Sequence, residues 1–385
     1  MKKNKAFKFR LYPTSEQKVL LGKTFGCCRL VFNYFLNLSN EKYEKEKTSL
    51  RYKDYALMLN DLKKEKEFLK EVDSISLQQE LRHLDDSFKH FFKYKKGYPN
   101  YKRKSMHNDS YSTINVNNNI VIIDKKHIKL PKLGIFKCKI HRDINVEYKL
   151  KSATISRNPS GKYYVSVLYE FEEKAIEYKI DESKIIGLDY QMKNLFISDD
   201  RIKTNDEFLK MYRKNEKRLQ FLQKTLSRRQ KPNYKKDIKS SNRYEKQRIK
   251  VAKLLEYQKN KRNDYYNKLS KEIANQYDIV VIEDLNMQDM ARANKLNSKA
   301  TYDNGFGIFR NILKYKLEAL GKKLIVVDKY FPSSKICNVC GHKNELLTIT
   351  DKTWECPNCH TIHNRDINAS INLKKEGLRI YNSKS

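Results

Sequence analysis

The stretch "CPNCHTIHNRDINASI", residues 356–371, decides the fold of the C-terminal part because it contains both cysteines and an aspartate, two types of side chain that can bind metals. It opens with two cysteines spaced as C-x-x-C, and Asp366 follows seven residues after the second one. Thiolates select soft metals such as zinc, whereas carboxylates select hard cations such as Mg²⁺. The stretch therefore raises the question whether Asp366 is incidental to a structural knuckle or belongs to a separate catalytic site.

Another C-x-x-C pair, Cys337 and Cys340, lies upstream, and fifteen residues separate Cys340 from Cys356. Each pair can present two thiolates to one tetrahedral ion, and the spacer is long enough for a hairpin. The spacing predicts a structural zinc ribbon with the ligands Cys337, Cys340, Cys356 and Cys359. Four thiolates leave no open position for water, so this site is expected to be structural. Two disulfides or unrelated redox pairs are the alternatives.

Three histidines lie close to the cysteines: His342, His360 and His363. Because four thiolates already fill a tetrahedral shell, we expect these side chains to be polar surface groups or nucleic-acid contacts.

The charge balance points to a nucleic-acid partner. The 385-residue chain carries 81 Lys+Arg against 46 Asp+Glu, a formal net charge of +35. Such an excess is typical of proteins that bind a polyanion. Residues 210–262 alone hold twenty Lys/Arg and four acids. This surplus favours a nucleic-acid track over the alternative, a merely solvated helix face.

We expect neither a membrane segment nor a signal peptide. The sequence has no run of about 18 apolar residues, and no apolar region follows the charged start "MKKNKAFKFRLYP". The remaining cysteines are scattered, which suits a reducing compartment. The expected location is the cytoplasm of a prokaryote, in association with the nucleoid.

The N-terminal half reads as a strand, then helices, then a β region. A helix should begin after Pro13, because Thr14 and Gln17 have capping-box spacing. Further helices are expected over residues 55–69 and 76–96, and strands over 111–173 with a hairpin turn at 158–161. The expected buried stripe of the first helix comprises Leu20, Leu21, Phe25, Cys28, Phe32, Phe35 and Leu36.

The C-terminal half alternates strands and helices, an α/β pattern. Two long helices are expected over residues 206–229 and 244–277, and another over 306–320. Buried strands are expected at residues 185–188 and 279–282, and near residue 325.

Three acids stand beside these buried elements: Asp189, Glu283 and Asp366. Taken singly, each would be read as a helix cap or turn former. In this order, on two strands and a final helix, an RNase H-like sheet would gather them around one spot. Two Mg²⁺ ions bound there could bridge a phosphate.

The motifs "GLDYQMKNL", "VVIEDLNM", "FPSSKICNVCG" and "HNRDINASINL" resemble, in this order, the transposon-encoded TnpB (OrfB) family. That family is related to the type V CRISPR effector nucleases. The resemblance covers nearly the whole chain, including the start "NKAFKFRLYP" and the stretch "LSRRQK".

The resemblance implies a multidomain α+β fold. The N-terminal half would combine a β-barrel wedge domain, residues 1–14 and 108–178, with a helical recognition lobe, residues 15–107. An RNase H-like (RuvC) α/β nuclease domain would occupy residues 179–330, with a basic helical insertion at 206–277. The zinc ribbon would span residues 331–361, and a final RuvC element and tail would span 362–385.

The resemblance also implies roles for single residues. Asp189, Glu283 and Asp366 fall on the family's magnesium-binding catalytic triad. Tyr52 and Gln78 fall near positions that contact the adjacent DNA motif in the family. The other expected nucleic-acid contacts are the basic residues Arg82, Lys95, Lys96, Arg228, Arg229 and Lys231. Two residues depart from the family pattern: Gln191 replaces a common glycine, and Asn364 stands where an aspartate is frequent.

The leading hypothesis is an Mg²⁺-dependent, RNA-guided DNA endonuclease of a mobile element. Its partners would be a guide RNA derived from the transposon end and double-stranded target DNA, cut beside a short adjacent motif. The alternatives are an RNA-guided repressor that binds without cutting and a zinc-ribbon accessory protein without a guide. The sequence leaves the oligomeric state open.

Overall fold

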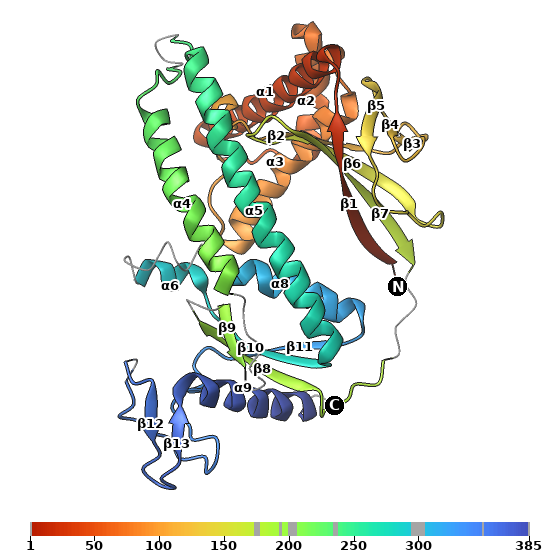
Figure 1. Cartoon of the computed structure of the whole chain (residues 1–385). Coiled ribbons are helices and arrows are strands. Elements are labelled where there is room, and N and C mark those ends of the chain that lie inside the picture. Colours follow the sequence, from red (N-terminus) through yellow and green to blue (C-terminus); the bar gives the residue numbers. More distant parts are fainter. Residues whose placement is uncertain are drawn as a thin grey trace. The chain divides into compact units, whose positions relative to one another are not determined.

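The computed structural model of the chain describes residues 2–172, 178–191, 195–198, 206–233, 238–293, 305–348 and 350–383. Contacts divide the chain into two units (Figure 1). The first comprises residues 1–174 and 248–253, and the second comprises residues 175–247 and 254–385.

The first unit contains a seven-stranded sheet in which every pairing is antiparallel. Its strands are β1 (Lys2–Tyr12), β2 (Asp109–Ile114), β3 (Val121–Ile122), β4 (His127–Leu130), β5 (Gly134–Lys139), β6 (Lys149–Arg157) and β7 (Tyr163–Glu172). The order is β2-β6-β7-β1-β5-β4-β3. The family resemblance implies a β-barrel here. Among the described residues β2 and β3 remain unpaired edges, so this ladder does not close.

The helices of the first unit are α1 (Ser15–Glu46), α2 (Tyr52–Glu65) and α3 (Ser74–Tyr94), with the short 3₁₀ turns η1 (Glu67–Lys70) and η2 (Lys104–Met106). The predicted capping box is confirmed, since Thr14 and Gln17 exchange hydrogen bonds of 3.1 and 3.3 Å. The predicted stripe is confirmed except at Leu20, which is 40% exposed. Leu20 lies one residue before Leu21, about 100° around the helix, and so faces away from the core.

Helix α1 is long and apolar enough, by length and composition, to cross a membrane. Half of its most apolar window is buried, and its buried side chains join the sheet and the other helices in one core. Helix α1 is therefore a central helix of this core.

The second unit is built on a four-stranded sheet of order β11-β10-β8-β9. Its strands are β8 (Ile185–Gln191), β9 (Leu195–Ser198), β10 (Ile279–Glu283) and β11 (Lys323–Val327). Strands β8, β10 and β11 run parallel, and β9 pairs antiparallel with β8. The helices are α4 (Asp206–Ser227), α5 (Asn242–Gln276), α6 (Met287–Ala293), α8 (Phe306–Ala319) and α9 (Arg365–Asn382). The long helices predicted from the sequence are therefore confirmed.

Both faces of this sheet are covered. Ile186 and Leu188 pack with α5 and α8 on one face, whereas Ile185 and Val281 pack with α9 on the other. Parallel strands buried on both sides read as continuous apolar runs, which is how the sequence reveals them.

The cysteine segment, which lies between β11 and α9 in the sequence, forms a small ribbon with its own strands. Strands β12 (Thr353–Glu355) and β13 (Ile362–Asn364) pair antiparallel. Cys337, Leu347, Trp354 and Cys356 make its core. This position, inserted between a sheet strand and the last helix, agrees with the sequence analysis.

Candidate active site and metal site

Two of the three predicted acids meet on neighbouring strands. Leu188 of β8 forms the last pair with Ile282 of β10, so the next residues, Asp189 and Glu283, lie side by side where the pairing of these two strands ends. Adjacent strands are about 4.8 Å apart. Side chains alternate along a strand, and Ile185 and Val281 face α9. Asp189 and Glu283 therefore face α9 as well.

Two glycines allow α9 to lie close enough to deliver the third acid. A Cβ atom on Gly187 of β8 would stand 2.1 Å from the Ser370 carbonyl oxygen of α9. A Cβ atom on Gly377 of α9 would stand 2.2 Å from a methyl carbon of Val281. No side chain fits at either point. The close approach places Asp366, in the first turn of α9, beside the ends of β8 and β10.

Glu283 and Asp366 are both close enough to Asp189 for their charges to act on it. Burial, followed by the charges of Glu283 and Asp366, raises the pKa of Asp189 well above its ordinary value. The nearby cations Arg365 and Lys352 act in the opposite direction. Burial also raises the pKa of Glu283, although the hydrogen bond from Ser333 lowers it in part. This cluster of hard oxygen ligands is short of positive charge, which suits a divalent cation.

Several neighbours hold these acids in place. The hydroxyl of Ser333 donates to Glu283 Oε1 at 2.6 Å. The side-chain amide of Gln191 donates to Asp366 Oδ2, and Lys352 Nζ lies 3.5 Å from the same oxygen. Thus the residue that replaces the family's glycine contacts a predicted ligand directly. Lys352 has no sequence signal of its own, and Ser333 lies in the motif "FPSSKICNVCG" without a role that the sequence reveals.

Asn364, the second departure from the family pattern, caps α9. Its Oδ1 accepts hydrogen bonds from the amides of Asp366 and Ile367 at 3.1 and 3.2 Å. Asparagine is among the preferred residues at this position. The substitution removes a charge near the acids but keeps the helix start that places Asp366.

The four cysteines form one cluster, as predicted. Their sulfur atoms all lie within 4.8 Å of one another, and no other group of three or more His, Cys, Asp or Glu ligand atoms in the described residues does so. The Sγ atoms of Cys337 and Cys359, and those of Cys340 and Cys356, are 3.6 Å apart. Tetrahedral bonds of 2.3 Å to one ion would separate sulfurs by about 3.8 Å, whereas a disulfide needs about 2.05 Å. The sulfurs are therefore arranged as metal ligands, and the disulfide alternative does not hold.

The predicted surface role of His363 is wrong. His363 is 5% exposed, its Nε2 lies 3.0 Å from Cys337 Sγ, and its ring packs against Trp354 at 4.8 Å. The alternation along β13 points this side chain into the ribbon, which the cysteine spacing alone does not reveal. His360 is exposed and pairs with Glu355 at 2.9 Å.

Asparagines attach the ribbon to α9. Asn368 accepts from the backbone and side-chain amides of Asn338 at 3.0 and 2.9 Å, and it donates to the Ile336 carbonyl at 2.7 Å. Asn372 donates to the Ser333 carbonyl at 2.8 Å. The first cysteine knuckle, Ser333 and the helix that carries Asp366 are thus joined by direct hydrogen bonds.

The predicted nucleic-acid contacts fall into separate groups. Arg82 lies over the Tyr52 ring, 4.3 Å from its centroid, and Gln78 occupies the same exposed side of α3 one turn earlier. Lys95 and Lys96 are exposed at the end of α3. Arg228, Arg229 and Lys231 are exposed just beyond α4. Their role in binding stays a prediction.

Known proteins resemble the chain over almost its full length. A protein of Streptomyces pristinaespiralis named "Putative RNA-guided DNA endonuclease" is 33% identical over 380 residues, which cover 97% of this chain and 89% of that one. The chain belongs to the TnpB (OrfB) family. An Escherichia coli (strain K12) protein named "Putative RNA-guided DNA endonuclease InsQ" is 29% identical over 98% of this chain and 93% of its own length.

Three domain families match parts of this TnpB-family chain. They are described as "Probable transposase" over residues 166–294, "Cas12f1-like, TNB domain" over residues 306–373, and "Helix-turn-helix domain" over residues 1–48. In this structure residues 2–12 form strand β1 and residues 15–46 the single helix α1, so the third description does not fit the observed elements.

The fold is also similar to that of a solved effector. A chain from the "Cryo-EM structure of the Cas12f1-sgRNA-target DNA complex" has a TM-score of 0.54 and 14% sequence identity, covering 97% of this chain and 99% of that one. At this identity the likeness concerns the fold alone.

Proposed function

We propose that this TnpB-family protein is an RNA-guided DNA endonuclease whose RuvC-like active site consists of Asp189, Glu283 and Asp366. The observation that carries the proposal is the gathering of these three acids at one edge of the sheet. A binding protein without cleavage would have no use for a buried carboxylate whose pKa is raised by two others. The near full-length relatives named as RNA-guided DNA endonucleases support the same activity.

The donor set favours Mg²⁺ at the acids and zinc at the cysteines. Carboxylate oxygens suit the hard ion, and a closed set of four thiolates suits zinc. The three carboxylates do not all lie within 4.8 Å of one another, and a two-metal site spans a wider ligand set than a single ion does. When bound, the pair of Mg²⁺ ions would activate water and stabilise the leaving oxygen of a phosphodiester.

The residues of this chain have separate tasks in that reaction. Asp189, Glu283 and Asp366 would hold the cations. Ser333 keeps Glu283 oriented, and Gln191 does the same for Asp366. The four-cysteine ribbon has no open coordination position, so its role is to fix the chain that leads into α9.

The remaining assignments follow from the family. The guide RNA and the target DNA would lie along the basic surfaces of both units, where Lys and Arg read the backbone of an RNA–DNA duplex. The first unit would hold most of the wedge and recognition domains expected at residues 1–178, and the second the RuvC-like domain with its ribbon. Such a protein would act in the cytoplasm, on the nucleoid.

Plasmid cleavage by the purified ribonucleoprotein tests the proposal. The wild-type complex should cut a plasmid that carries the target and its adjacent motif in the presence of Mg²⁺, and Asp189→Ala should not. Equal cutting by both proteins would refute the assignment of the acids. A protein that binds the target but never cuts it would be a repressor, and one that purifies without a discrete RNA would be an accessory factor.

A further inference from the structure

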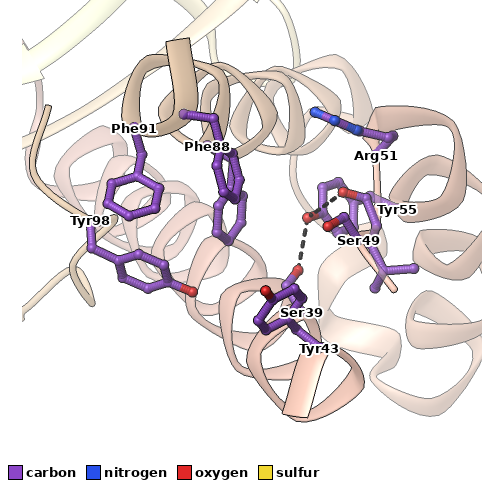
Figure 2. A pocket seen from close by; sticks show the side chains of 10 residues that line it. Ser39, Tyr43, Ser49, Arg51, Tyr55, Phe88, Phe91 and Tyr98 are labelled. Atoms are coloured by element: carbon purple, nitrogen blue, oxygen red, sulfur yellow. Dashed lines mark hydrogen bonds between the residues drawn. The ribbon is translucent and has the colours of Figure 1, made fainter. Parts of the chain in front are cut away.

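The first unit contains an aromatic pocket that none of the assigned activities uses. It lies between α1, the start of α2 and the end of α3, and it has a volume of about 270 Å³ (Figure 2). Its walls are mainly aromatic rings, those of Tyr43, Phe88, Phe91, Phe92 and Tyr98, and Arg51 adds a charged group. Three of these rings are largely open to solvent, since Tyr43 is 52%, Phe92 61% and Tyr98 45% exposed.

One wall of the pocket is held rigid before any ligand arrives. The Tyr98 ring meets Phe88 and Phe91 edge to face, with centroids 5.7 and 5.2 Å apart. Its hydroxyl donates to Asn40 Oδ1 of α1 at 2.5 Å. Figure 2 shows Phe88, Phe91 and Tyr98 on one side of the pocket, opposite Tyr43. A fixed aromatic wall facing a gap is suited to the flat face of another ring.

The polar groups of the pocket divide into two sets. The hydroxyls of Ser39 and Tyr55, at the bottom of the pocket, form a hydrogen bond of 2.7 Å with each other, so both already have a partner. By contrast, in the described parts of the chain the Arg51 guanidinium and the Ser49 hydroxyl make no hydrogen bond. They remain available at the rim to the edge of a heteroaromatic ring.

The rim carries positive charge as well. Arg51 lines it, and Lys47 Nζ lies 5.5 Å from the centroid of the Tyr43 ring. Lys95 and Lys96 stand between Phe92 and Tyr98 in the chain and are exposed. Acids lie near the pocket as well, Glu44 close to Tyr98, and Asp85 and Asp54 close to Tyr55. Cations beside aromatic rings are the arrangement that holds a phosphate and its base together.

We propose that this pocket binds one unpaired, unstacked nucleobase of the guide RNA. The inference rests on the proposed function for its partner but not on the cleavage site. The volume lies just below the roughly 300–1,000 Å³ of sites for drug-sized molecules, so it suits a single base. Folded RNA exposes unstacked bases in loops and bulges, where aromatic side chains recognise them. Guide pairing also leaves the displaced DNA strand unpaired, so the test compares RNA with DNA of the same sequence.

Phe92→Ala in the full-length protein tests the pocket. The side chain is mostly exposed, so its loss should leave the fold intact, which the thermal unfolding midpoint would verify. Phe92→Tyr restores a ring, and Phe68→Ala is the matched control because Phe68 is 46% exposed but does not line the pocket. The probes are the RNA that co-purifies with the protein and single-stranded RNA and DNA oligonucleotides of one sequence, at fixed salt and without Mg²⁺.

The expected result is a selective loss of RNA affinity. Stacking of one base corresponds to a change of about 5- to 150-fold in Kd, and Phe92→Ala should show such a weakening while Phe92→Tyr and Phe68→Ala stay within about twofold. Ultraviolet crosslinking of the ribonucleoprotein should join an RNA base to Tyr43 or Tyr98. Unchanged RNA affinity would overturn the proposal, and so would weakening confined to DNA. A wild-type protein that binds no RNA at all would instead overturn the proposed function, which keeps the two failures distinct.

Discussion

The four cysteines and Asp366 lie close together in the sequence, yet the two sites to which they belong have opposite surroundings. The cysteine sulfurs already lie at metal-binding distances, and they come from one short segment with its own small core. The acids come from two strands and a helix that are far apart in the chain, and they are held by partners such as Ser333 and Gln191. One site is complete within its own segment, whereas the other exists only after the second unit has folded.

This difference explains the division of labour. A closed thiolate shell stabilises a ribbon that is too small to fold alone. An open set of carboxylates keeps room for cations and substrate, at the cost of gathering negative charge. The hydrogen bonds of Asn338, Asn368 and Asn372 then connect the stable site to the helix that carries Asp366.

Loss of a zinc ligand should have the largest effect. Zinc contributes about 10–16 kcal/mol to the folding of such sites, so Cys356→Ser should release zinc and unfold the ribbon. Trp354 is the only tryptophan of the chain and is 7% exposed inside the ribbon. Its emission should therefore shift to the red. Cys138→Ser removes a buried cysteine of the first unit and should leave both zinc content and emission unchanged. A folded, zinc-free Cys356→Ser ribbon would contradict this account.

Asp189→Asn should remove cleavage and yet stabilise the metal-free protein. Losing a metal ligand should lower the cleavage rate by about 10³-fold or more, because bound metals supply several kcal/mol of transition-state stabilisation.

The stability effect follows from the raised pKa of Asp189. The folded protein keeps a proton that the unfolded chain releases above about pH 4. Stability of the metal-free protein should therefore fall as pH rises from about 4 through the raised pKa, and Asp189→Asn should lack this part of the decline. Urea unfolding without Mg²⁺ between about pH 4 and 8 measures it. Parallel curves for the two proteins would contradict the prediction.

Much of this comparison could be predicted from the sequence. The cysteine spacing is local, so four ligands and one ribbon follow from it directly. Each acid ends or begins an apolar element, and their order on two strands and a final helix predicts that an RNase H-like sheet gathers them. The close packing of Gly187 against Ser370 and of Gly377 against Val281 brings α9 onto the sheet, and it produces no periodic pattern of apolar residues in the sequence.

Contacts between separate segments could not be predicted. His363 lies inside the ribbon rather than at the surface, and Gln191 bonds Asp366 across 175 residues of chain. Such contacts depend on strand direction and on how closely α9 lies on the sheet, and a single sequence encodes neither in a readable pattern.

Ser333→Ala probes the hydrogen bond that connects the two regions. Its loss should slow cleavage by about tenfold, since a hydrogen bond to a charged group contributes about 1.5–3 kcal/mol. The pKa of Glu283 should rise further without this donor, which moves the cleavage–pH profile to higher pH. The neighbouring Ser334→Ala serves as the control. An unshifted profile in Ser333→Ala would show that Ser333 does not act through Glu283.

Lys352→Ala should have the smallest effect. Lys352 is 70% exposed and lies 3.5 Å from Asp366, so solvent and salt screen the pair. Removing this competing cation should lower the Mg²⁺ concentration needed for half-maximal cleavage by up to about fivefold, and less at high salt. Lys343→Ala, on the same ribbon, is the control. A higher Mg²⁺ requirement in Lys352→Ala would mean that Lys352 helps to hold the substrate.

The central claim is that two chemically different metal sites lie side by side and are separable. Zinc content and DNA cleavage measured on one preparation of Asp366→Ala test it most directly. The account predicts one zinc ion per chain, unchanged RNA and DNA binding, and no cleavage. Loss of zinc together with cleavage, or cleavage at the wild-type rate, would contradict it.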